Sequence, residues 1–119
     1  RNGDALEFAA EALRGDVGVV KAAVKSSRYA LRFAADELRG DKDFMLEAVK
    51  EKGFRLEYAS GELKADREVV MEAIKQDGRA LRFASEELKV DRGVVMEAVR
   101  QDGLALAFAS TLLRADVEV

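Results

Sequence analysis

A chain of 119 residues with 49% apolar and 36% charged residues is long enough for one domain and has the composition of a helical globular protein rather than a disordered one. It contains no proline, cysteine or histidine, which excludes disulfides, thiolate nucleophiles, histidine acid–base chemistry and ordinary zinc sites. The net charge of −3 argues against a general polyelectrolyte binder, and no apolar run approaches the roughly 18–20 residues that cross a bilayer.

A period of 25 residues runs through the sequence. Leucine, aromatic and aspartate residues return at this spacing, as Leu6, Leu31, Leu56, Leu81 and Leu106, as Phe8, Phe33, Tyr58, Phe83 and Phe108, and as Asp16, Asp41, Asp66, Asp91 and Asp116. Self-similarity at a fixed period of this length is typical of stacked supersecondary units. We therefore predict an all-α fold, specifically an α-solenoid of tandem 25-residue helix–turn–helix repeats. With about 8–10 Å between packed helices, the array would be on the order of 40–50 Å long.

The predicted repeats form a single domain over residues 1–119. In chain order they are a partial repeat over 1–15, full repeats over 16–40, 41–65, 66–90 and 91–115, and a truncated start over 116–119. The partial repeat consists of a second helix from Gly3 to Arg14. Because the chain starts at Arg1 inside a repeat and shows no signal-peptide pattern, we expect a processed product or a piece of something longer.

Each full repeat is predicted to begin with an amphipathic helix, most clearly in residues 66–90. Asp66 stands at an N-cap position, where its carboxylate accepts the backbone N–H of Glu68 or Val69. Apolar residues then follow at i, i+3 and i+4 spacing as far as Gly78. We expect this glycine to adopt the left-handed conformation that commonly ends a helix.

A second, shorter helix is predicted from about Arg79, with Leu81, Ala84 and Leu88 on one face. Ser85 either continues this helix or caps a separate short turn. The connections between these elements are very short, so the repeat reads as helix–turn–helix with little loop.

Two sets of equivalent positions have both a structural and a functional interpretation. The aromatic positions stand among invariant leucines and alanines, so we predict that they form core rather than a base-stacking platform for nucleic acid. The second set alternates in charge as Glu7, Arg32, Glu57, Arg82 and Ala107. Exposed ion pairs are worth only about 0–1 kcal/mol, so we interpret this set as fixing the register between repeats, with a charged recognition strip as the alternative.

Two further sets of positions are uniformly basic. They are Arg14, Arg39, Lys64, Lys89 and Arg114, and Lys25, Lys50, Lys75 and Arg100. Basic ridges on a helical array could follow phosphates, so an RNA-binding array is an alternative function. The second set, however, lies at helix C-termini, where cations are favoured, with glutamates three residues earlier that neutralise most of it. We therefore favour a structural role and expect no nucleic-acid partner.

No pattern in the sequence indicates catalysis or metal binding. The aspartates lack the Asp-x-Asp-x-Asp-Gly spacing of a calcium loop, and N-capping accounts for each of them. There is no glycine-rich phosphate loop, no Ser/His/Asp set and no pair of carboxylates outside the repeat pattern. We predict that the protein is not an enzyme and has no catalytic, cofactor-binding or metal-binding residues and no small-molecule substrate.

Departures from the period are more informative about function. Arg28 stands where the other repeats have glycine, which predicts a distorted first turn. The last copy is unusually apolar between Leu104 and Leu113. If these positions face solvent in earlier copies, they form an apolar patch of the kind that marks an interface.

The candidate partner-binding residues are Tyr29, Phe54, Leu104, Ala107 and Leu112. Tyr29 and Phe54 occupy the position of Leu104 in earlier repeats, which suggests that the apolar strip extends along the array. We expect these residues to contact a partner protein, a lipid-facing surface or a further repeat. The alternative is that they only cap the local core.

The segment DREVVMEAIKQDGRALRFASEELK, residues 66–89, resembles the repeat of the family called domain of unknown function 4116. That pattern, roughly D-x-x-V-V-x-x-A-V-x-x-x-G-x-x-L-x-x-A-S-x-x-L, fits three copies closely and two less well, over essentially the whole chain. The departures are Arg28 for glycine, Ala10 and Ala35 for serine, and the apolar last copy. The resemblance implies an array of a type abundant in algal and protist proteins, with no assigned catalytic residues.

These observations predict a non-catalytic interaction module, or a scaffold or linker subunit that binds other proteins within a large assembly. The family resemblance suggests a narrower form, a peripheral subunit of an algal photosystem–antenna complex. In that case the chain would be intracellular and lie in the chloroplast, against the thylakoid membrane without crossing it. Salt-dependent RNA binding would favour the alternative function, and salt-insensitive association through the apolar end would favour the first.

Overall fold

The computed structural model describes residues 11–27 and 29–108, and every regular element among them is helical. The prediction of an all-α fold is confirmed. Three kinds of element alternate. Ten-residue α-helices are α2 (Val17–Ser26), α4 (Lys42–Glu51), α6 (Arg67–Gln76) and α7 (Arg92–Gln101). The 3₁₀ helices that follow them are η2 (Ala30–Phe33), η3 (Gly53–Tyr58), η4 (Gly78–Phe83) and η6 (Gly103–Phe108). Short turns are α1 (Glu11–Arg14), α3 (Asp36–Arg39), α5 (Gly61–Lys64) and η5 (Leu88–Val90).

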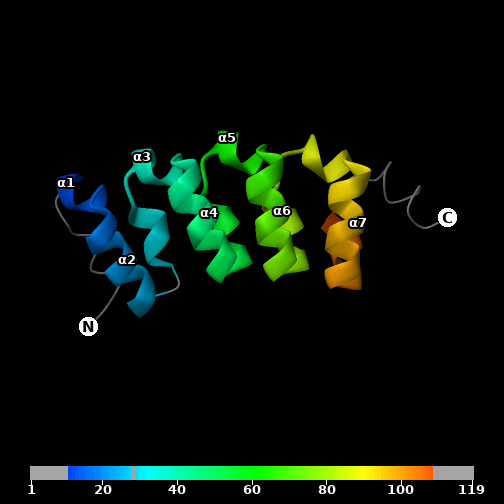
Figure 1. The fold of residues 1–119 in the computed structure, drawn as a ribbon, viewed down its shortest axis with the longest axis horizontal. Helices are drawn as coiled ribbons and strands as arrows, with labels where there is room; N and C mark the ends of the chain where they lie inside the picture. The colour runs from blue at the N-terminus through cyan, green and yellow to red at the C-terminus, as the bar shows by residue number, and fades with distance from the viewer. Residues whose placement is uncertain (1–10, 28, 109–119) are drawn as a thin grey trace.

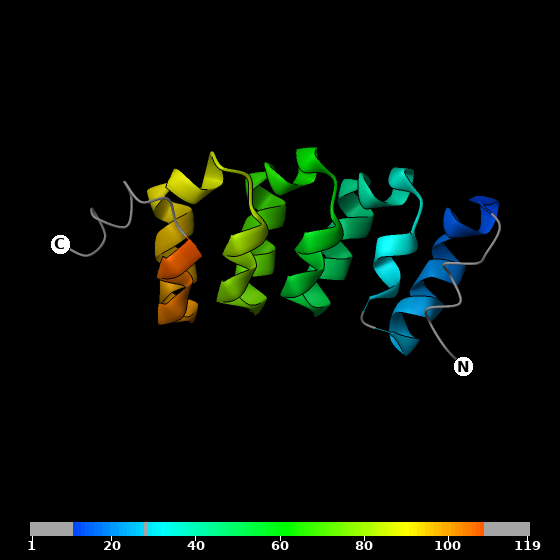
Figure 2. The same ribbon diagram turned by 180° about the vertical axis from the view of Figure 1, so that it is seen from behind.

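The elements lie in two rows along a molecule of 51 × 24 × 19 Å. The long α-helices stand side by side in one row (Figure 1), and the 3₁₀ helices form the second row behind them (Figure 2). The short turns follow one long edge of both rows. We call residues 16–40 unit 1, 41–65 unit 2, 66–90 unit 3, and the described residues from 91 onward unit 4.

The aspartates cap the long helices as predicted. Asp16, Asp41 and Asp91 each accept a backbone N–H from the third residue after them, at 3.0–3.1 Å. Asp66 accepts two, from Glu68 at 2.9 Å and from Val69 at 3.2 Å. The carboxylate thereby satisfies N–H groups that have no partner within the helix. Asp116, the remaining member of the set, lies outside the described residues.

The predicted second helix is present, but it is a 3₁₀ helix that ends at Phe83, so the predicted extension to Leu88 is wrong. Its residues Gly78 and Leu81 are buried and spaced three apart, and the buried Ala84 follows at the same spacing just after the helix ends. A 3₁₀ helix has three residues per turn, so this spacing places them on one face, whereas an α-helix would rotate them apart. Ala84 is then extended, which separates the 3₁₀ helix from the short turn.

The interpretation of the glycines as left-handed helix ends is also wrong, since no described glycine has a positive φ. Gly53 and Gly78 are instead packed against the next unit. A Cβ on Gly53 would lie 2.3 Å from the backbone oxygen of Ala73, and one on Gly78 would lie 2.6 Å from that of Ala98. These positions require glycine because a neighbouring helix backbone occupies the side-chain space.

The short turns join each unit to the previous one through the backbone. The N–H groups of Ala35, Ser60 and Ser85 donate to the carbonyl oxygens of Arg14, Arg39 and Lys64, at 2.9–3.0 Å. In addition, the hydroxyls of Ser60 and Ser85 accept the N–H of the residue three positions later, at 3.3 Å. Of the two alternatives for Ser85, the cap of a separate short turn is therefore confirmed.

One continuous apolar core runs through the described units. Its members with no exposed surface come from the long helices and from the 3₁₀ helices, namely Val20, Met45, Val49, Leu56, Val69, Val70, Ala73, Ile74, Leu81, Val94, Val95, Ala98 and Ala105. Because each 3₁₀ helix packs on its own α-helix and, in units 2 and 3, on the next one, most of the burial occurs between units.

Candidate functional site

The predicted partner-binding residues lie on the row of 3₁₀ helices. Leu104 is 76% exposed and Tyr29 is 49% exposed, whereas Phe54 is half-buried. Ala107 is exposed one 3₁₀ turn after Leu104, so the two share the outer face of η6. Leu112 lies outside the described residues, as does Arg28, for which a distorted turn was predicted.

Unit 4 also exposes positions that are buried in units 2 and 3. Gly103 is exposed, although Gly53 and Gly78 are buried, and a Cβ on Gly103 would meet no described atom within 4 Å. Leu106 and Val99 are half-buried, while their equivalents in units 2 and 3 are fully buried. Val99, Gly103, Leu104, Leu106 and Ala107 together form what we call the unit 4 face.

A charged residue interrupts the apolar strip between Phe54 and Leu104. Arg79 donates through Nε and Nη2 to both oxygens of Asp77, each at 3.1 Å, and its Nε lies 3.9 Å from Asp102. These hydrogen bonds raise the pKa of Arg79 and hold the pKa of Asp77 below its usual range. The strip is therefore apolar at its two ends and ionic in unit 3.

The alternating charges do not pair as predicted. No ion pair joins Glu57 to Arg32 or to Arg82 in the part of the chain that the structure describes. The guanidinium carbon of Arg82 instead lies 5.3 Å from the ring centre of Phe83 and 5.4 Å from that of Phe108 in the next unit. Cation–π contact takes the place of the predicted charge ladder.

The aromatic positions pack against the core but remain partly exposed. Phe33 is covered on one side by Arg32, whose guanidinium carbon lies 4.7 Å from the ring centre. Phe83 and Phe108 are covered by Arg82 in the same way. The prediction that these rings pack against the core is confirmed, and arginines lie over three of them.

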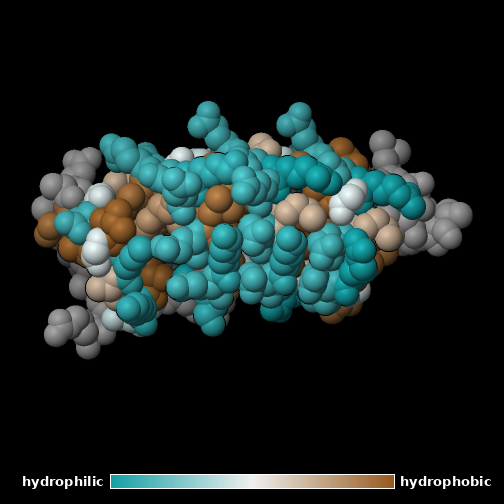
Figure 3. Space-filling view, in the orientation of Figure 1, coloured by the Kyte–Doolittle hydropathy of each residue, from teal (hydrophilic) through white to brown (hydrophobic). Residues whose placement is uncertain are grey.

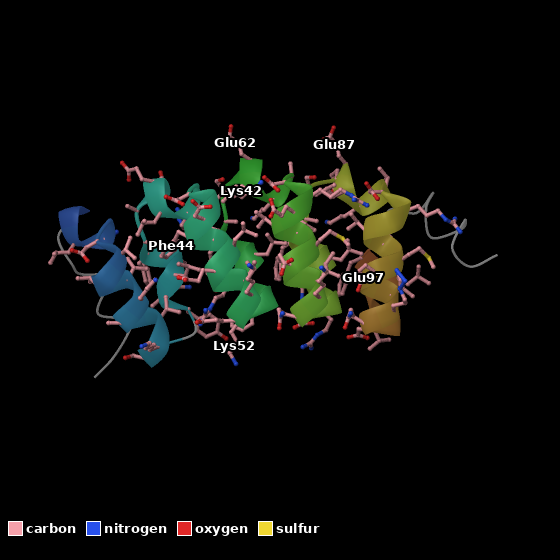
Figure 4. The ribbon with its side chains drawn as sticks, in the orientation of Figure 1. Lys42, Phe44, Lys52, Glu62, Glu87 and Glu97 are labelled. Carbon is pink, nitrogen blue, oxygen red and sulfur yellow. The ribbon has the colours of Figure 1, made fainter. Side chains whose placement is uncertain are left out.

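The basic ridges are less available than their sequence pattern indicates. Arg39 and Lys89 are half-buried and form ion pairs with Asp36 at 2.8 Å and with Glu86 at 3.4 Å. In the second ridge, Lys75 pairs with Glu72 at 3.7 Å, as the i−3 spacing predicts. Glu62 and Glu87 project outward beside the first ridge (Figure 4). Acidic side chains therefore lie beside the cations of both ridges.

A cavity that sequence reasoning missed lies between units 1 and 2. It has a volume of about 280 Å³ and is lined by Lys21, Val24, Lys25, Leu31, Phe44, Glu47, Ala48, Glu51 and Arg55. We call it the junction pocket. α2 and η2 make sparse contacts with α4, whereas η3 packs closely on α6 and η4 on α7. Figure 4 shows Phe44 in the space between α2 and α4, and Figure 3 shows apolar side chains gathered at this end of the same face.

Arg55 is the distinctive residue of the junction pocket. It is only 8% exposed, and its Nη1 donates to the backbone oxygen of Ala48 at 3.2 Å and to Glu51 at 3.0 Å. Its Nε is buried and has no hydrogen-bond partner among the described residues. On the opposite wall, Lys21 pairs with Glu47 at 2.7 Å, which lowers the pKa of that carboxyl.

Comparison of equivalent positions in the repeats could have indicated this pocket. The positions equivalent to Arg55 are the buried alanines Ala30, Ala80 and Ala105. Lys21 likewise stands where later units have leucine or methionine, and Val17 where they have a cation. The departure at Arg28 was recognised from the sequence, but these three accompanying departures in the same junction were not.

The described residues show no group of three or more acidic side chains that could hold a metal ion. No helix among them is long and apolar enough to cross a membrane.

A family model, described as domain of unknown function (DUF4116), matches residues 1–39 and 41–89. The chain belongs to this family. The match agrees with the resemblance expected from residues 66–89, and it includes both walls of the junction pocket and the glycines that pack between units. No curated protein and no solved structure matches the sequence. For this DUF4116 protein, function must therefore be inferred from its own surface.

Proposed function

We propose that this DUF4116 chain is an α-solenoid that works as a non-catalytic protein-interaction module, with the unit 4 face as its binding surface. The observation that carries the proposal is the exposure of Leu104, at 76%, beside Gly103, Leu106 and Ala107. A large aliphatic side chain so exposed, next to half-buried ones, loses unfavourable water contact when a partner covers it.

The geometry of the earlier junctions indicates what kind of partner fits. At those junctions, Gly53 and Gly78 receive the backbone oxygen of a helix from the next unit. Gly103 presents the same absence of a side chain, and Asp102 and Leu104 flank it as Asp77 and Arg79 flank Gly78. We therefore propose that the occupant is an α-helix, of a partner protein or of a further repeat, packed with its backbone close to Gly103.

Nucleic-acid binding is the less supported function. The described residues of the first basic ridge are half-buried, both ridges carry ion pairs with neighbouring acids, and the net charge is negative. Binding along a nucleic-acid backbone requires cations that are free to contact the phosphates and displace their counterions. The observed pairing works against this.

Site-specific photo-cross-linking tests the proposal. A benzophenone amino acid at position 104, incorporated in the native source, should cross-link one protein, whereas the same probe at the exposed Val90 should not cross-link that protein. The captured protein is then purified and its affinity for the unmodified chain is measured at two salt concentrations.

The Leu104→Glu variant should bind this partner at least about tenfold more weakly, because a buried charge without a pair replaces an apolar contact. Val90→Glu is the matched control and should bind normally. Equal affinity of Leu104→Glu and the unmodified chain would overturn the proposal. So would a partner that is RNA, recognised by an affinity that falls several orders of magnitude between 50 and 200 mM salt.

A further inference from the structure

The junction pocket exists because one junction in the array departs from the others. In the later junctions the oxygens of Ala73 and Ala98 lie against glycine. The equivalent oxygen of Ala48 instead accepts a hydrogen bond from Arg55, a residue of its own unit. The sequence has Arg28 at the glycine position of unit 1. At the junction of units 1 and 2 the structure has a cavity with the guanidinium of Arg55 in its wall.

Residues at core positions are partly exposed beside this cavity. Phe44 and Ala48 are half-buried, although the equivalent Val69, Ala73, Val94 and Ala98 have no exposed surface. Val24 is half-buried in the same way, whereas Val49 and Ile74 are fully buried. Part of the wall thus consists of apolar side chains of core type, which favour an apolar group beside the charged ones.

We propose that the junction pocket is a binding site for an organic carboxylate that carries a short apolar group. The carboxylate binds the guanidinium of Arg55, and the apolar group lies against Phe44 and Val24. This site is separate from the unit 4 face, and the proposal does not depend on the function of that face.

The charges around the pocket support an anion. Its cations are Lys21, Lys25 and Arg55, and its carboxylates are Glu47 and Glu51. Glu47 is paired with Lys21 and Glu51 with Arg55, so one positive charge is in excess. Lys25 is exposed on this rim and forms no ion pair with another described residue.

The hydrogen bonding of Arg55 also supports an anionic ligand. Both of its hydrogen bonds to described residues use Nη1, while the Nε–H donor is buried and unpaired. A buried donor without an acceptor is costly, and arginine forms its strongest contacts with carboxylates through two parallel N–H donors. A ligand carboxylate in the pocket would accept from Nη2, which forms no hydrogen bond with a described residue, whereas the Nε–H has almost no accessible surface.

The size of the cavity restricts the ligand. A volume of about 280 Å³ lies near the lower end of ligand pockets, which are typically about 300–1,000 Å³. It fits a group of amino-acid size, such as phenylacetate. The carboxylate can belong to a free acid or to the C-terminal residue of a peptide, and these two sources present the same groups to Arg55.

Nuclear magnetic resonance titration tests the site with phenylacetate as the probe. Phenylacetamide is the matched neutral control, because it keeps the ring and replaces the carboxylate. Phenylacetate should shift the Nε–H signal of Arg55 and the amides of Phe44 and Ala48, with an affinity at least about tenfold higher than that of phenylacetamide. A tripeptide ending in phenylalanine, compared with its C-terminal amide, distinguishes the two sources.

The variant Arg55→Ala should lose at least about tenfold in affinity for phenylacetate while remaining folded, because alanine occupies this position in the other units. Arg82→Ala removes an arginine outside the pocket and should leave the affinity unchanged. Higher affinity for the tripeptide acid than for phenylacetate assigns the site to a peptide terminus, and the reverse order assigns it to a free acid. The proposal is overturned if phenylacetate and its amide bind equally, if neither binds, or if folded Arg55→Ala binds as tightly as the unmodified chain.

Discussion

Nη1 of Arg55 lies 3.2 Å from the backbone oxygen of Ala48, which is the atom that a glycine would approach if unit 1 were built like units 2 and 3. The sequence has arginine at position 28 instead of that glycine and arginine at position 55 instead of alanine. Both departures occur at positions that are buried in later units, as Gly53 and Gly78 and as Ala80 and Ala105. We expect them to depend on each other energetically.

The double variant Arg28→Gly/Arg55→Ala should be more stable than the sum of the single changes predicts. Glycine alone leaves Arg55 in the space between the units, and alanine alone leaves the cavity unfilled. Together they restore the residues found at the later junctions, so the coupling free energy should favour the double variant by about 0.5–3 kcal/mol. Urea denaturation of the four proteins measures it, and additive effects within about 0.5 kcal/mol would show that the two departures are independent.

Gly78→Ala should destabilise the protein by about 1–3 kcal/mol, since a Cβ there would lie 2.6 Å from the backbone oxygen of Ala98 and one of the packed helices must shift. Gly61→Ala is the matched control. No atom lies within 4 Å of a Cβ at that position, and Gly61 begins the short helix α5. Alanine there should be neutral or stabilise by up to about 1 kcal/mol. Equal unfolding midpoints for the two variants would contradict the packing explanation.

The sequence predicted the elements that depend on local chemistry. The N-caps follow from aspartate followed by an apolar period of 3.6, and the structure has them at Asp16, Asp41, Asp66 and Asp91. The separate short turn at Ser85 was one of two predicted alternatives for the same reason. Each of these features is decided within a few neighbouring residues.

The 3₁₀ helices could also have been predicted from local pattern. Gly78, Leu81 and Ala84 are spaced by three, which matches a 3₁₀ helix better than an α-helix. The error came from extending the apolar pattern to Leu88, which belongs to a different element. Splitting the segment at Ala84 gives the observed boundaries.

Contacts between units could not be predicted in the same way. The role of Gly78 depends on the oxygen of Ala98, and the pocket is lined by Lys21 of unit 1 together with Arg55 of unit 2. The sequence shows each departure, but only the packing of unit 1 on unit 2 brings them together. Similarly, the charge at Arg82 was visible, whereas its contact with Phe108 was not.

The stability of the array should fall on acidification below about pH 4, in part through Asp66. Burial raises the pKa of Asp66, but hydrogen bonds from Lys42 and from the backbone N–H groups of Val69 and Glu68 hold it below its usual value. A carboxyl with a lowered folded-state pKa contributes stability above the unfolded pKa, and this stability is lost as the pH falls through the folded one.

Asp66→Asn should therefore lower the free energy of unfolding at pH 7 by up to about 1 kcal/mol, and the difference should shrink below about pH 4. Asparagine keeps the N-cap and removes the charge that attracts Lys42, whose Nζ lies 3.0 Å from Asp66. Asp41→Asn is the control, because Val17 stands where a cation would pair with Asp41. Urea denaturation from pH 3 to 7 compares the two, and an equal pH-dependent loss in both would refute the role of Lys42.

Arg82→Gln should destabilise the protein by about 1 kcal/mol, because the guanidinium carbon lies 5.3 Å from the ring centre of Phe83 and 5.4 Å from that of Phe108, and each exposed cation–π contact is worth about 0.5–1 kcal/mol. Glu57→Gln, at the equivalent exposed position of unit 2, is the control and should change the stability by less than about 0.5 kcal/mol. Thermal and urea unfolding measure both. If Glu57→Gln costs as much as Arg82→Gln and the two changes are coupled, charge pairing between units, rather than stacking on Phe108, holds this face together.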